Sequence, residues 1–464
     1  MTRVDDPKQP DSRARWGVLL AVGVGTFMTA LDGSVVNIIL PVLRASFSTS
    51  VTNVEWVVTT YLLVVSGLLL GFGRLGDLRG HKAVYIAGFG LFVLGSALCG
   101  LAPSVGAMIG FRGLQALGGA MLYANSPAIL TKSFPPAQRG QALGLQGTMT
   151  YLGLTVGPSL GGLLAAQVGW RWVFYLNVPV GLAAVLLSLR FVPSDNGETS
   201  GERFDFLGAG LFLAGLVTLL FALNQGEEWG WGSVPILSLG ILAVALLAAF
   251  VVLERRLASP MLDLRLFSNT TFSSSTASAV INYMCVYSLL FLMPFYLIQG
   301  RALGSEKAGL VLTALPLVMA VAAPLSGTLS DRIGPRMPSV WGMGILGGAL
   351  LLLSRLAPDS SMAFVAAGLA LAGLGIGIFV APNTSALLGS APRQRQGIAS
   401  GILATGRNVG MVLGVGLAGA IFTTILGSAH SDALFQGIDA AFLAFAGLAA
   451  LGAAVAALRQ RQST

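Results

Sequence analysis

Long runs of hydrophobic and small residues occupy most of the chain, and short polar segments separate them. An α-helix rises ~1.5 Å per residue, so about 20 residues cross the ~30 Å hydrocarbon core of a membrane. Fourteen runs reach this length and predict an all-α protein that crosses the membrane repeatedly. The predicted spans are 16–40, 54–73, 83–102, 106–130, 141–165, 173–192, 206–224, 234–253, 272–299, 307–326, 338–357, 361–387, 397–425 and 439–458.

Composition and charge agree with this pattern. Of the 464 residues, 55% are hydrophobic and 10% are charged, whereas soluble domains carry about 25% charged residues. Of the 27 Lys and Arg residues, 20 lie in segments on one side of the predicted spans, five on the other side and two within spans. This asymmetry follows the positive-inside rule, so both termini are expected in the cytoplasm. It also explains the net charge of +8 without a nucleic-acid partner.

Two internal matches indicate a repeat. The loop GRLGDLRGHK at 73–82 recurs as GTLSDRIGPR at 327–336, which places Asp77 and Asp331 254 residues apart. A second match aligns four glycines at an offset of 257 residues. These are Gly140, Gly144, Gly153 and Gly157, aligned with Gly397, Gly401, Gly410 and Gly414. Repeats of this kind build secondary transporters, with the substrate site between the halves.

The spans and the repeat together predict the domain organisation. Eight spans separate the paired loops, so the plan is six helices, two inserted helices and six further helices. The first apolar run is too long for a signal-peptide core and no A-x-A-like site follows it, so it is expected to remain as a helix. The inserted helices carry no charge inside their spans and are expected at the periphery. The expected parts are a tail at 1–15, a six-helix bundle at 16–192, linkers with the inserted helices (206–224 and 234–253) at 193–269, a second bundle at 270–458 and a tail at 459–464.

Asp32 is the only acid that we place inside a predicted span, and Glu55 marks the outer end of the second span. A lone acid inside a membrane costs ~2.5–3.5 kcal/mol on insertion scales, so Asp32 should face protein or water. Arg112 lies at a similar depth in the fourth span and can reach Asp32 if the two spans are neighbours. The pair is either a static lock of the bundle or a switch in which Asp32 gains and loses a proton. We favour the switch.

A stripe of small residues follows in the fifth predicted span. Gly153, Gly157, Gly161 and Gly162 lie at positions i, i+4, i+8 and i+9, which predicts one face that another helix approaches closely. Pro158 removes one backbone hydrogen bond and is expected to bend this span. The face serves either close packing alone or a sliding contact between conformational states.

The repeated loop carries the candidate gating residues. Its glycines permit a tight turn, its acid can cap or pair beneath a helix end, and its cations can face anionic headgroups. A solvated, positively charged loop is the simpler interpretation, but its recurrence favours a role in gating. The candidates are Gly73, Asp77, Arg79, Gly80 and Lys82 in the first copy, and Asp331 and Arg332 in the second.

Three motifs resemble the major facilitator superfamily. The first loop is similar to its G-x-L-x-D-x-x-G-R-K motif, with His81 where the family usually has Arg. The stretch FRGLQALGGAML (Phe111–Leu122) resembles the R-x-x-Q-G-x-G pattern of helix four, with Ala116 as a departure. GLTVGPSLGG (Gly153–Gly162) matches the G-x-x-x-G-P-x-x-G-G pattern of helix five, a signature of the antiporters.

Two further stretches resemble the fourteen-helix drug/proton antiporter subfamily. LDGSVVNIILP (Leu31–Pro41) is similar to L-D-x-T-V-V-N-x-A-L-P, with Ser34 and Ile39 as departures, and WRWVFYLNVPVG (Trp170–Gly181) resembles the corner before helix six. The resemblance covers the whole chain. It implies the major facilitator fold with pseudo-twofold halves, in the inner (plasma) membrane of a bacterium and functional as a monomer. It also implies proton-coupled export of hydrophobic cationic or neutral drugs by alternating access.

The candidate substrate-binding residues are aromatic and polar side chains within the spans. They are Phe27, Met28, Asn37, Gln115, Tyr123, Tyr151, Tyr283, Tyr287 and Arg407. Aromatic residues in membrane spans also serve as packing or interfacial residues, and Arg407 either lines the cavity or extends to the cytoplasmic surface.

Several other classes are disfavoured. Cys99 and Cys285 lie in separate apolar runs, and we find no metal-ligand spacing, nucleophile–base pair or Walker loop. An enzyme and an ATP-driven pump are therefore not expected. No cofactor is expected, and the proton gradient is expected to drive transport. An exporter dedicated to one compound, such as an antibiotic made by the same cell, stays open, as does a nutrient transporter of the same fold.

Overall fold

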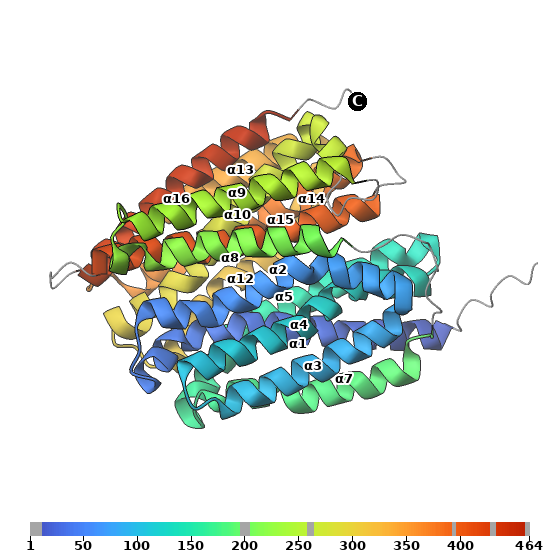
Figure 1. Cartoon of the computed structure of the whole chain (residues 1–464), viewed down its shortest axis with the longest axis horizontal. Coiled ribbons are helices and arrows are strands. Elements are labelled where there is room, and N and C mark those ends of the chain that lie inside the picture. The colour runs from blue at the N-terminus through green and yellow to red at the C-terminus, as the bar shows by residue number, and fades with distance from the viewer. Residues whose placement is uncertain (1–11, 195–204, 258–263, 392–395, 427–432, 460–464) are drawn as a thin grey trace, which may run out of the picture.

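The computed structural model describes residues 12–194, 205–257, 264–391, 396–426 and 433–459 (Figure 1). The secondary structure of these residues is entirely helical, and fourteen helical segments are long and apolar enough to cross a membrane. The predicted all-α architecture with fourteen spans is therefore confirmed. Much of the two predicted tails, 1–11 and 460–464, lies outside the described residues.

The helices fall into two sets of six spans with one inserted pair. The first set is α1 (Ser12–Ser46), α2 (Val51–Arg79), α3 (His81–Leu101), α4 (Val105–Ser133), α5 (Pro136–Gln167), and the span formed by α6 (Arg171–Tyr175) and α7 (Asn177–Phe191). The inserted pair is α8 (Phe206–Trp229) and α9 (Val234–Arg256). The second set is η1 (Leu264–Ser268), α10 (Thr270–Pro294), η2 (Phe295–Gly300), α11 (Ser305–Leu312), α12 (Ala314–Ile333), α13 (Arg336–Leu353), α14 (Met362–Ser390), α15 (Gln396–Leu426) and α16 (Ala433–Ala457).

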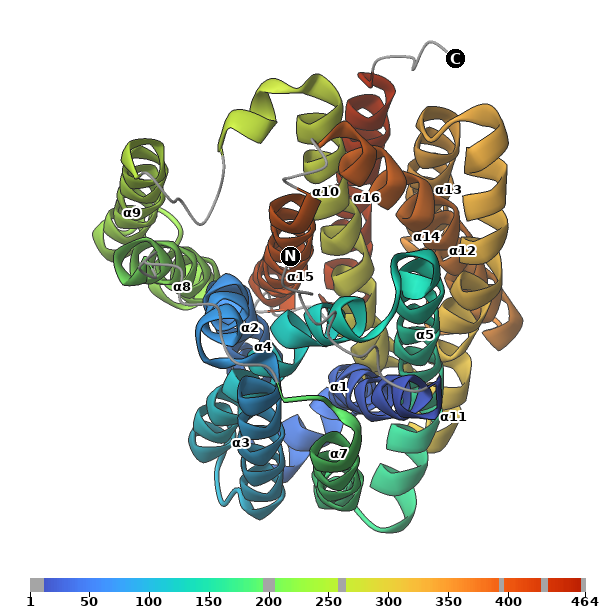
Figure 2. The same ribbon diagram turned by 90° about the vertical axis from the view of Figure 1, so that its right-hand side faces the viewer.

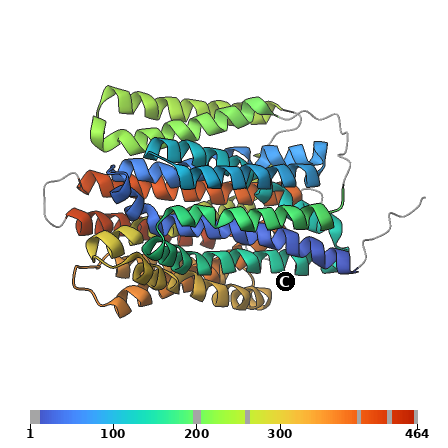
Figure 3. The same ribbon diagram turned by 90° about the horizontal axis from the view of Figure 1, so that it is seen from below.

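The two sets form two bundles, called here the N-half and the C-half. Figure 2 looks along the helices and shows the N-half at the lower left and the C-half at the upper right. Figure 3 shows the long helices running side by side from one end of the molecule to the other. We call the end at which α1 begins and α16 ends the terminal end, and the opposite end the distal end.

The internal repeat reappears in the backbone. Helices α2 and α11 begin at Val51 and Ser305, which are separated by the same 254 residues as the two loops. Gly80 and Gly334 close the equivalent turns with φ angles of 88° and 81°. Both angles lie in the left-handed region that glycine adopts at little cost. The two copies therefore share one turn geometry.

The repeat extends to helix packing. A Cβ placed on Gly88 of α3 would lie 3.1 Å from the carbonyl oxygen of Gly118 in α4. In the second half, a Cβ on Gly342 of α13 would lie 2.6 Å from the carbonyl oxygen of Gly375 in α14. Because any side chain at these positions would separate the backbones, glycine sets the spacing of this helix pair in both halves.

The inserted helices differ from each other in position. Helix α9 packs mainly on α8 and lies on the flank, as expected for a peripheral element (Figure 2). Helix α8 also packs on α2 and on α15, so it lies where the two halves meet. Glu254, at the terminal end of α9, is buried. The inserted pair is thus peripheral on one side and contacts both halves on the other.

We expect Gly334→Ala to lower the thermal stability of the purified protein. No heavy atom lies within 4 Å of a Cβ at this position, so the cost comes from the left-handed backbone and is about 1–2 kcal/mol. The matched control is Gly344→Ala in α13, which has the same open surroundings in ordinary helical backbone. The measurement is the melting temperature in detergent. Equal melting temperatures for the two variants would contradict the argument.

Candidate functional site

Asp32 and Arg112 form an ion pair inside the N-half. Arg112 Nη1 lies 2.7 Å from Asp32 Oδ2, and the two residues are 2% and 1% exposed. Helices α1 and α4 are neighbours, and this was the condition under which Arg112 could reach Asp32. A buried ion pair is tolerated only when its remaining hydrogen-bonding groups are satisfied, so the surrounding side chains are decisive.

Two amides complete the shell of the Asp32 carboxylate. Gln115 Nε2 and Asn177 Nδ2 donate to Asp32 Oδ1 over 2.9 and 2.8 Å. Asn177 also donates to Ser96 Oγ over 3.0 Å, and Ser96 Oγ donates to the Phe174 carbonyl oxygen over 2.9 Å. Side chains from α4 and α7 therefore converge on one carboxylate of α1, and Ser96 of α3 accepts from the α7 amide.

Arg112 is held on its other sides as well. Its Nη1 also donates to Gln115 Oε1 over 2.6 Å, and its Nε donates to the Val57 carbonyl oxygen over 3.2 Å. The guanidinium lies over the Tyr61 ring, with Cζ 4.3 Å from the ring centroid. Such stacking adds a cation–π attraction. Arg112 thereby joins the carboxylate on α1 to an aromatic side chain on α2.

A group of tyrosines extends from Tyr61 to the other half. Tyr61 lies near Tyr123 of α4 and Tyr287 of α10. Arg407 of α15 stacks over Tyr283, with 4.9 Å between Cζ and the ring centroid, and lies near Tyr123 and Tyr287. Four of the residues predicted to bind substrate thus meet between the halves, and Arg407 faces this group.

The other predicted substrate residues lie elsewhere. Met28 is buried, with its Sδ near Gly181 of α7, so it packs inside the N-half. Gln115 is fully buried and supports Asp32 and Arg112. Asn37 is also buried and donates to the Gly33 carbonyl oxygen in its own helix over 2.8 Å. Met28 and Gln115 therefore lie within the packing of the N-half, and the Asn37 amide is hydrogen-bonded to its own helix.

Two predicted substrate residues remain. Phe27 is half-buried on α1, where its carbonyl oxygen faces Gly153 of α5. The side chain of Tyr151 lies outside the described part of the structure.

The small residues of α5 do not form one face. Gly153, Gly157 and Gly161 pack against α1, and a Cβ on Gly157 would meet Ser34. Gly162 faces the backbone of Ser305 in α11, in the other half. The expected single face was wrong because position i+9 lies about 100° around the helix from position i+8. The glycines of α5 therefore serve two different interfaces.

The gating residues of the first loop surround the α2–α3 turn. A Cβ on Gly73 would lie 3.9 Å from Ala124, Arg79 is exposed, and Lys82 Nζ donates to the Leu189 carbonyl oxygen over 3.1 Å. His81 Nδ1 lies 2.8 Å from Asn125 Oδ1, which ties the turn to α4. The side chains of Asp77 and Asp331 lie outside the described residues, and Arg332 is exposed.

Close contacts join the distal parts of the two halves along two lines, which we call seams. The first seam lies between α5 and α11. Ser159 Oγ lies 2.7 Å from Thr313 Oγ1, and a Cβ on Gly309 would meet the Pro158 carbonyl oxygen. Nearby, Arg44 Nη1 donates to Gln299 Oε1 over 2.8 Å. These contacts hold the distal ends of the two halves together.

A second seam lies between α2 and α15, and α8 covers it. Asn224 of α8 accepts a hydrogen bond from Trp56 Nε1 over 2.9 Å, and Trp231 Nε1 donates to Thr424 Oγ1 over 3.2 Å. Glu55 points into this seam and is 2% exposed. Because α2 begins four residues before Glu55, this acid lies inside the span. The expectation that Asp32 is the only acid within a span was therefore wrong.

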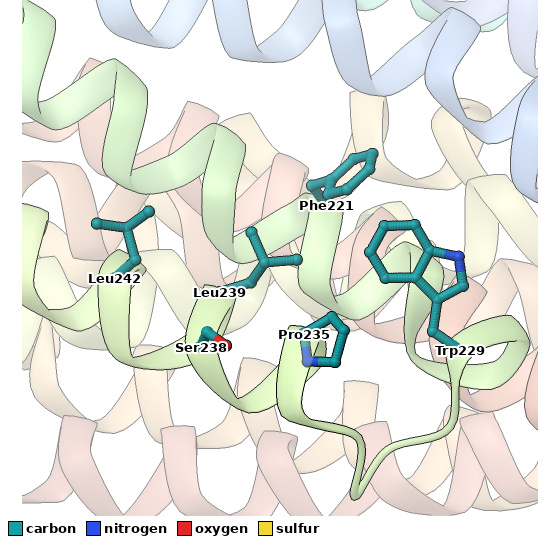
Figure 4. Close-up of a pocket in the computed structure, with 6 residues that line it drawn as sticks. All are labelled: Phe221, Trp229, Pro235, Ser238, Leu239 and Leu242. Atoms are coloured by element: carbon teal, nitrogen blue, oxygen red, sulfur yellow. The ribbon is translucent and has the colours of Figure 1, made fainter.

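A groove of about 330 Å³ lies between α8 and α9 (Figure 4). Its residues are remote in sequence from Asp32. It is lined by Phe221, Trp229, Pro235, Ser238, Leu239 and Leu242. The lining carries no charge and contains none of the predicted site residues. We therefore assign the groove to the outer surface of the inserted pair and not to the candidate site.

Sequence reasoning missed Asn177 and Ser96 as members of the site. Asn177 lies in WRWVFYLNVPVG, which was noted for its resemblance alone. A polar amide in an apolar span is costly without a partner, and this was the available signal. Among the described residues, no cluster of His, Cys, Asp and Glu could hold a metal ion.

Comparisons with known proteins agree with this geometry. The sequence profile of the Major Facilitator Superfamily matches residues 22–205 and 275–463. The riboflavin transporter RibZ of Clostridioides difficile is 34% identical, over 89% of this chain and 90% of its own. The multidrug resistance protein Stp of Mycobacterium tuberculosis is 35% identical, over 89% of this chain and 77% of its own. An inward-facing crystal structure of a bacterial homologue of the lysosomal transporter Spinster has a TM-score of 0.71 at 17% identity, covering 97% of each chain.

We expect a large side chain at Gly157 and one at Gly162 to disturb different helix interfaces. Gly157→Leu should destabilise the N-half by about 1–3 kcal/mol through overpacking against α1 and lower the melting temperature. Gly162→Leu should leave the N-half intact and separate α5 from α11.

The separation is measured by the reactivity of Ser159→Cys toward a maleimide in nanodiscs. We expect faster labelling in Gly162→Leu than in Gly157→Leu. Equal labelling would show that Gly162 does not hold the first seam closed.

Proposed function

Because the chain belongs to the major facilitator superfamily, we propose that this transporter exports hydrophobic drug-like compounds in exchange for protons. The chain is a multi-pass membrane protein and not an enzyme. Its relative Stp is named a multidrug resistance protein, which supports export of drug-like compounds. The distribution of Lys and Arg supports placing both termini, and hence the terminal end, in the cytoplasm.

The observation that carries the proposal is the Asp32–Arg112 pair with its two amide donors. An ionised Asp32 accepts from Arg112, Gln115 and Asn177 at once. A protonated Asp32 loses its charge attraction to Arg112, so each proton that binds weakens the joint between α1 and α4. Asp32 is therefore the proposed proton carrier, and Arg112 determines whether the ionised or the protonated state of Asp32 is the more stable.

Alternating access supplies the coupling. The distal seams hold the halves together, while Tyr123, about three turns from Arg112 toward the terminal end, is 37% exposed. This combination favours a state closed at the distal end and accessible from the terminal end. In the proposed cycle the drug enters from the cytoplasm among the tyrosines, and Asp32 takes its proton when the distal end opens.

A second candidate is a transporter dedicated to one solute. The relative RibZ is named a riboflavin transporter and is as similar to this chain as Stp. The same tyrosine group can stack on a flat heteroaromatic ring as well as on a drug. The number of unrelated compounds that the protein moves separates the two candidates.

We expect expression in a bacterium without its own drug pumps to lower the accumulation of several unrelated cationic dyes. Asp32→Asn should abolish this efflux at equal abundance in the membrane, and Glu228→Gln, an exposed acid of α8, should retain it. Accumulation is read by dye fluorescence with and without a protonophore. Export of riboflavin alone would select the dedicated transporter, and undiminished efflux by Asp32→Asn would remove Asp32 from the mechanism.

Exchange of one monovalent cation for one proton should be insensitive to membrane potential. Such exchange moves no net charge, whereas a neutral drug exchanged for one proton gains ~2.3 kcal/mol per 100 mV. The measurement imposes a potassium–valinomycin potential on proteoliposomes without a pH gradient and follows a monocationic dye. Rapid potential-driven transport of the dye would mean that a second proton crosses the membrane in each cycle.

A further inference from the structure

Glu55 is a buried carboxyl group that the exchange at Asp32 does not use. A Cβ on Gly419 of α15 would meet its Oε2 atom and lie 2.6 Å from its Cδ atom. A Cβ on Gly416 would lie 4.0 Å from its Oε1 atom. The carboxyl group therefore reaches from α2 in the N-half to the backbone of α15 in the C-half.

The repeat shows that the seam does not need a side chain at this position. The offset of 254 residues aligns Glu55 with Gly309, and the offset of 257 aligns Gly419 with Gly162. At the first seam, Gly309 and Gly162 make contacts between the halves through the backbone alone. The second seam has a carboxyl group where the first has a glycine, so the acid is an addition to the repeated packing.

Glu55 has no cation as a partner within the described part of the chain. The Asn224 side chain lies beside its carboxyl group, where Asn224 Oδ1 accepts from Trp56 Nε1 and Asn224 Nδ2 donates to the Thr52 carbonyl oxygen over 3.4 Å. Helix α15 carries no titratable side chain between Gly416 and Leu426. The described neighbours of this acid on α8 and α15, namely Asn224, Gly416 and Gly419, are therefore neutral.

Several charged and titratable groups of the helices packed around α2 are engaged in contacts of their own. Arg112 of α4 pairs with Asp32 of α1, and Cys99 of α3 donates to Gln115. Arg44 of α1 donates to Gln299, and Glu228 of α8 accepts from Gln225. The Tyr61 ring of α2 lies beneath Arg112.

An ionised carboxylate in such a place loses the hydration that stabilises its charge, whereas a protonated carboxyl group loses much less. We propose that Glu55 is a second proton-binding site, which takes a proton from the distal aqueous phase as the second seam closes. Hydronium gives its proton to the carboxylate and leaves water, and opening of the seam reverses this step.

This proton returns to the side from which it came, so it adds nothing to the number of protons exchanged per drug. The inference deepens the proposed function, because the place of Glu55 in a transport cycle rests on that function. The link between protonation and closure stands apart from transport. Lower distal pH should favour closure, by up to about tenfold in the closed-to-open ratio per pH unit for one linked proton.

The test measures closure of the distal end by electron spin resonance on the full chain in nanodiscs. Spin labels are placed at Ala45→Cys and Asp359→Cys, which are exposed distal positions of the N-half and C-half. Every protein also carries Asp32→Asn, so that titration of Asp32 does not contribute and no proton exchange is required. The distance distribution is recorded from pH 5 to pH 9, a window of about two units on either side of neutral that spans the usual range for buried carboxyl groups.

We expect the short-distance population to grow as pH falls when Glu55 is present. In Glu55→Gln, which keeps the shape of the protonated acid, closure should dominate and lose this pH dependence. The control Glu228→Gln should behave as the parent. Glu55→Asp keeps a titratable group and should keep a pH dependence, which guards against a general packing defect.

Unchanged pH dependence in Glu55→Gln would overturn the proposal, as would its loss in Glu228→Gln. A distal end that opens in Glu55→Gln at low pH would also overturn it. Because none of these readouts uses transport, failure of Asp32 as the proton carrier would leave this result intact and would appear in the efflux assay.

Discussion

A carboxylate and a guanidinium buried among membrane-spanning helices constrain everything around them. Once Asp32 and Arg112 leave water, each remaining hydrogen-bonding group needs a protein partner, and removing one member of such a pair costs about 3–5 kcal/mol. Gln115, Asn177 and the Val57 carbonyl oxygen supply these partners. Helices α1, α2, α4 and α7 are therefore held in register by one ion pair, and protonation of Asp32 acts on all of them.

The contact between the halves is built on a different principle, namely backbone proximity at glycines. At the first seam Gly162 and Gly309 bring α5 and α11 together, and at the second seam Gly416 and Gly419 accept Glu55 from α2. Contacts of this kind hold closely packed helices but contribute few hydrogen bonds, so two rigid halves can separate along them. Helix α8 covers only the second seam, which makes the two seams unequal.

The sequence was sufficient for the features that repeat or that fill a whole helix. Hydrophobic length predicted the fourteen spans, and the offset of 254 residues predicted equivalent loops, whose turns the structure closes at Gly80 and Gly334. Similar depths in two spans indicated that Arg112 could reach Asp32, and the structure pairs them. These are properties of one helix, or of a chain compared with itself.

The remaining features depend on which helix faces which, and one sequence does not contain that information. Gly161 and Gly162 are adjacent in the chain but face different halves. Asn177 is an ordinary polar residue until α7 places its amide next to Asp32. Glu55 was assigned to the end of a span because the predicted span began at residue 54, three residues after the start of α2.

The central claim is that Asp32 carries the exchanged proton, and proton movement itself tests it most directly. Purified protein in proteoliposomes with a pH-sensitive dye inside is exposed to an exported drug, and protons moved per drug are counted. The account predicts about one proton per monocationic drug, since one group exchanges it, and none for Asp32→Asn. Equal proton movement by Asp32→Asn and the parent protein would contradict the account.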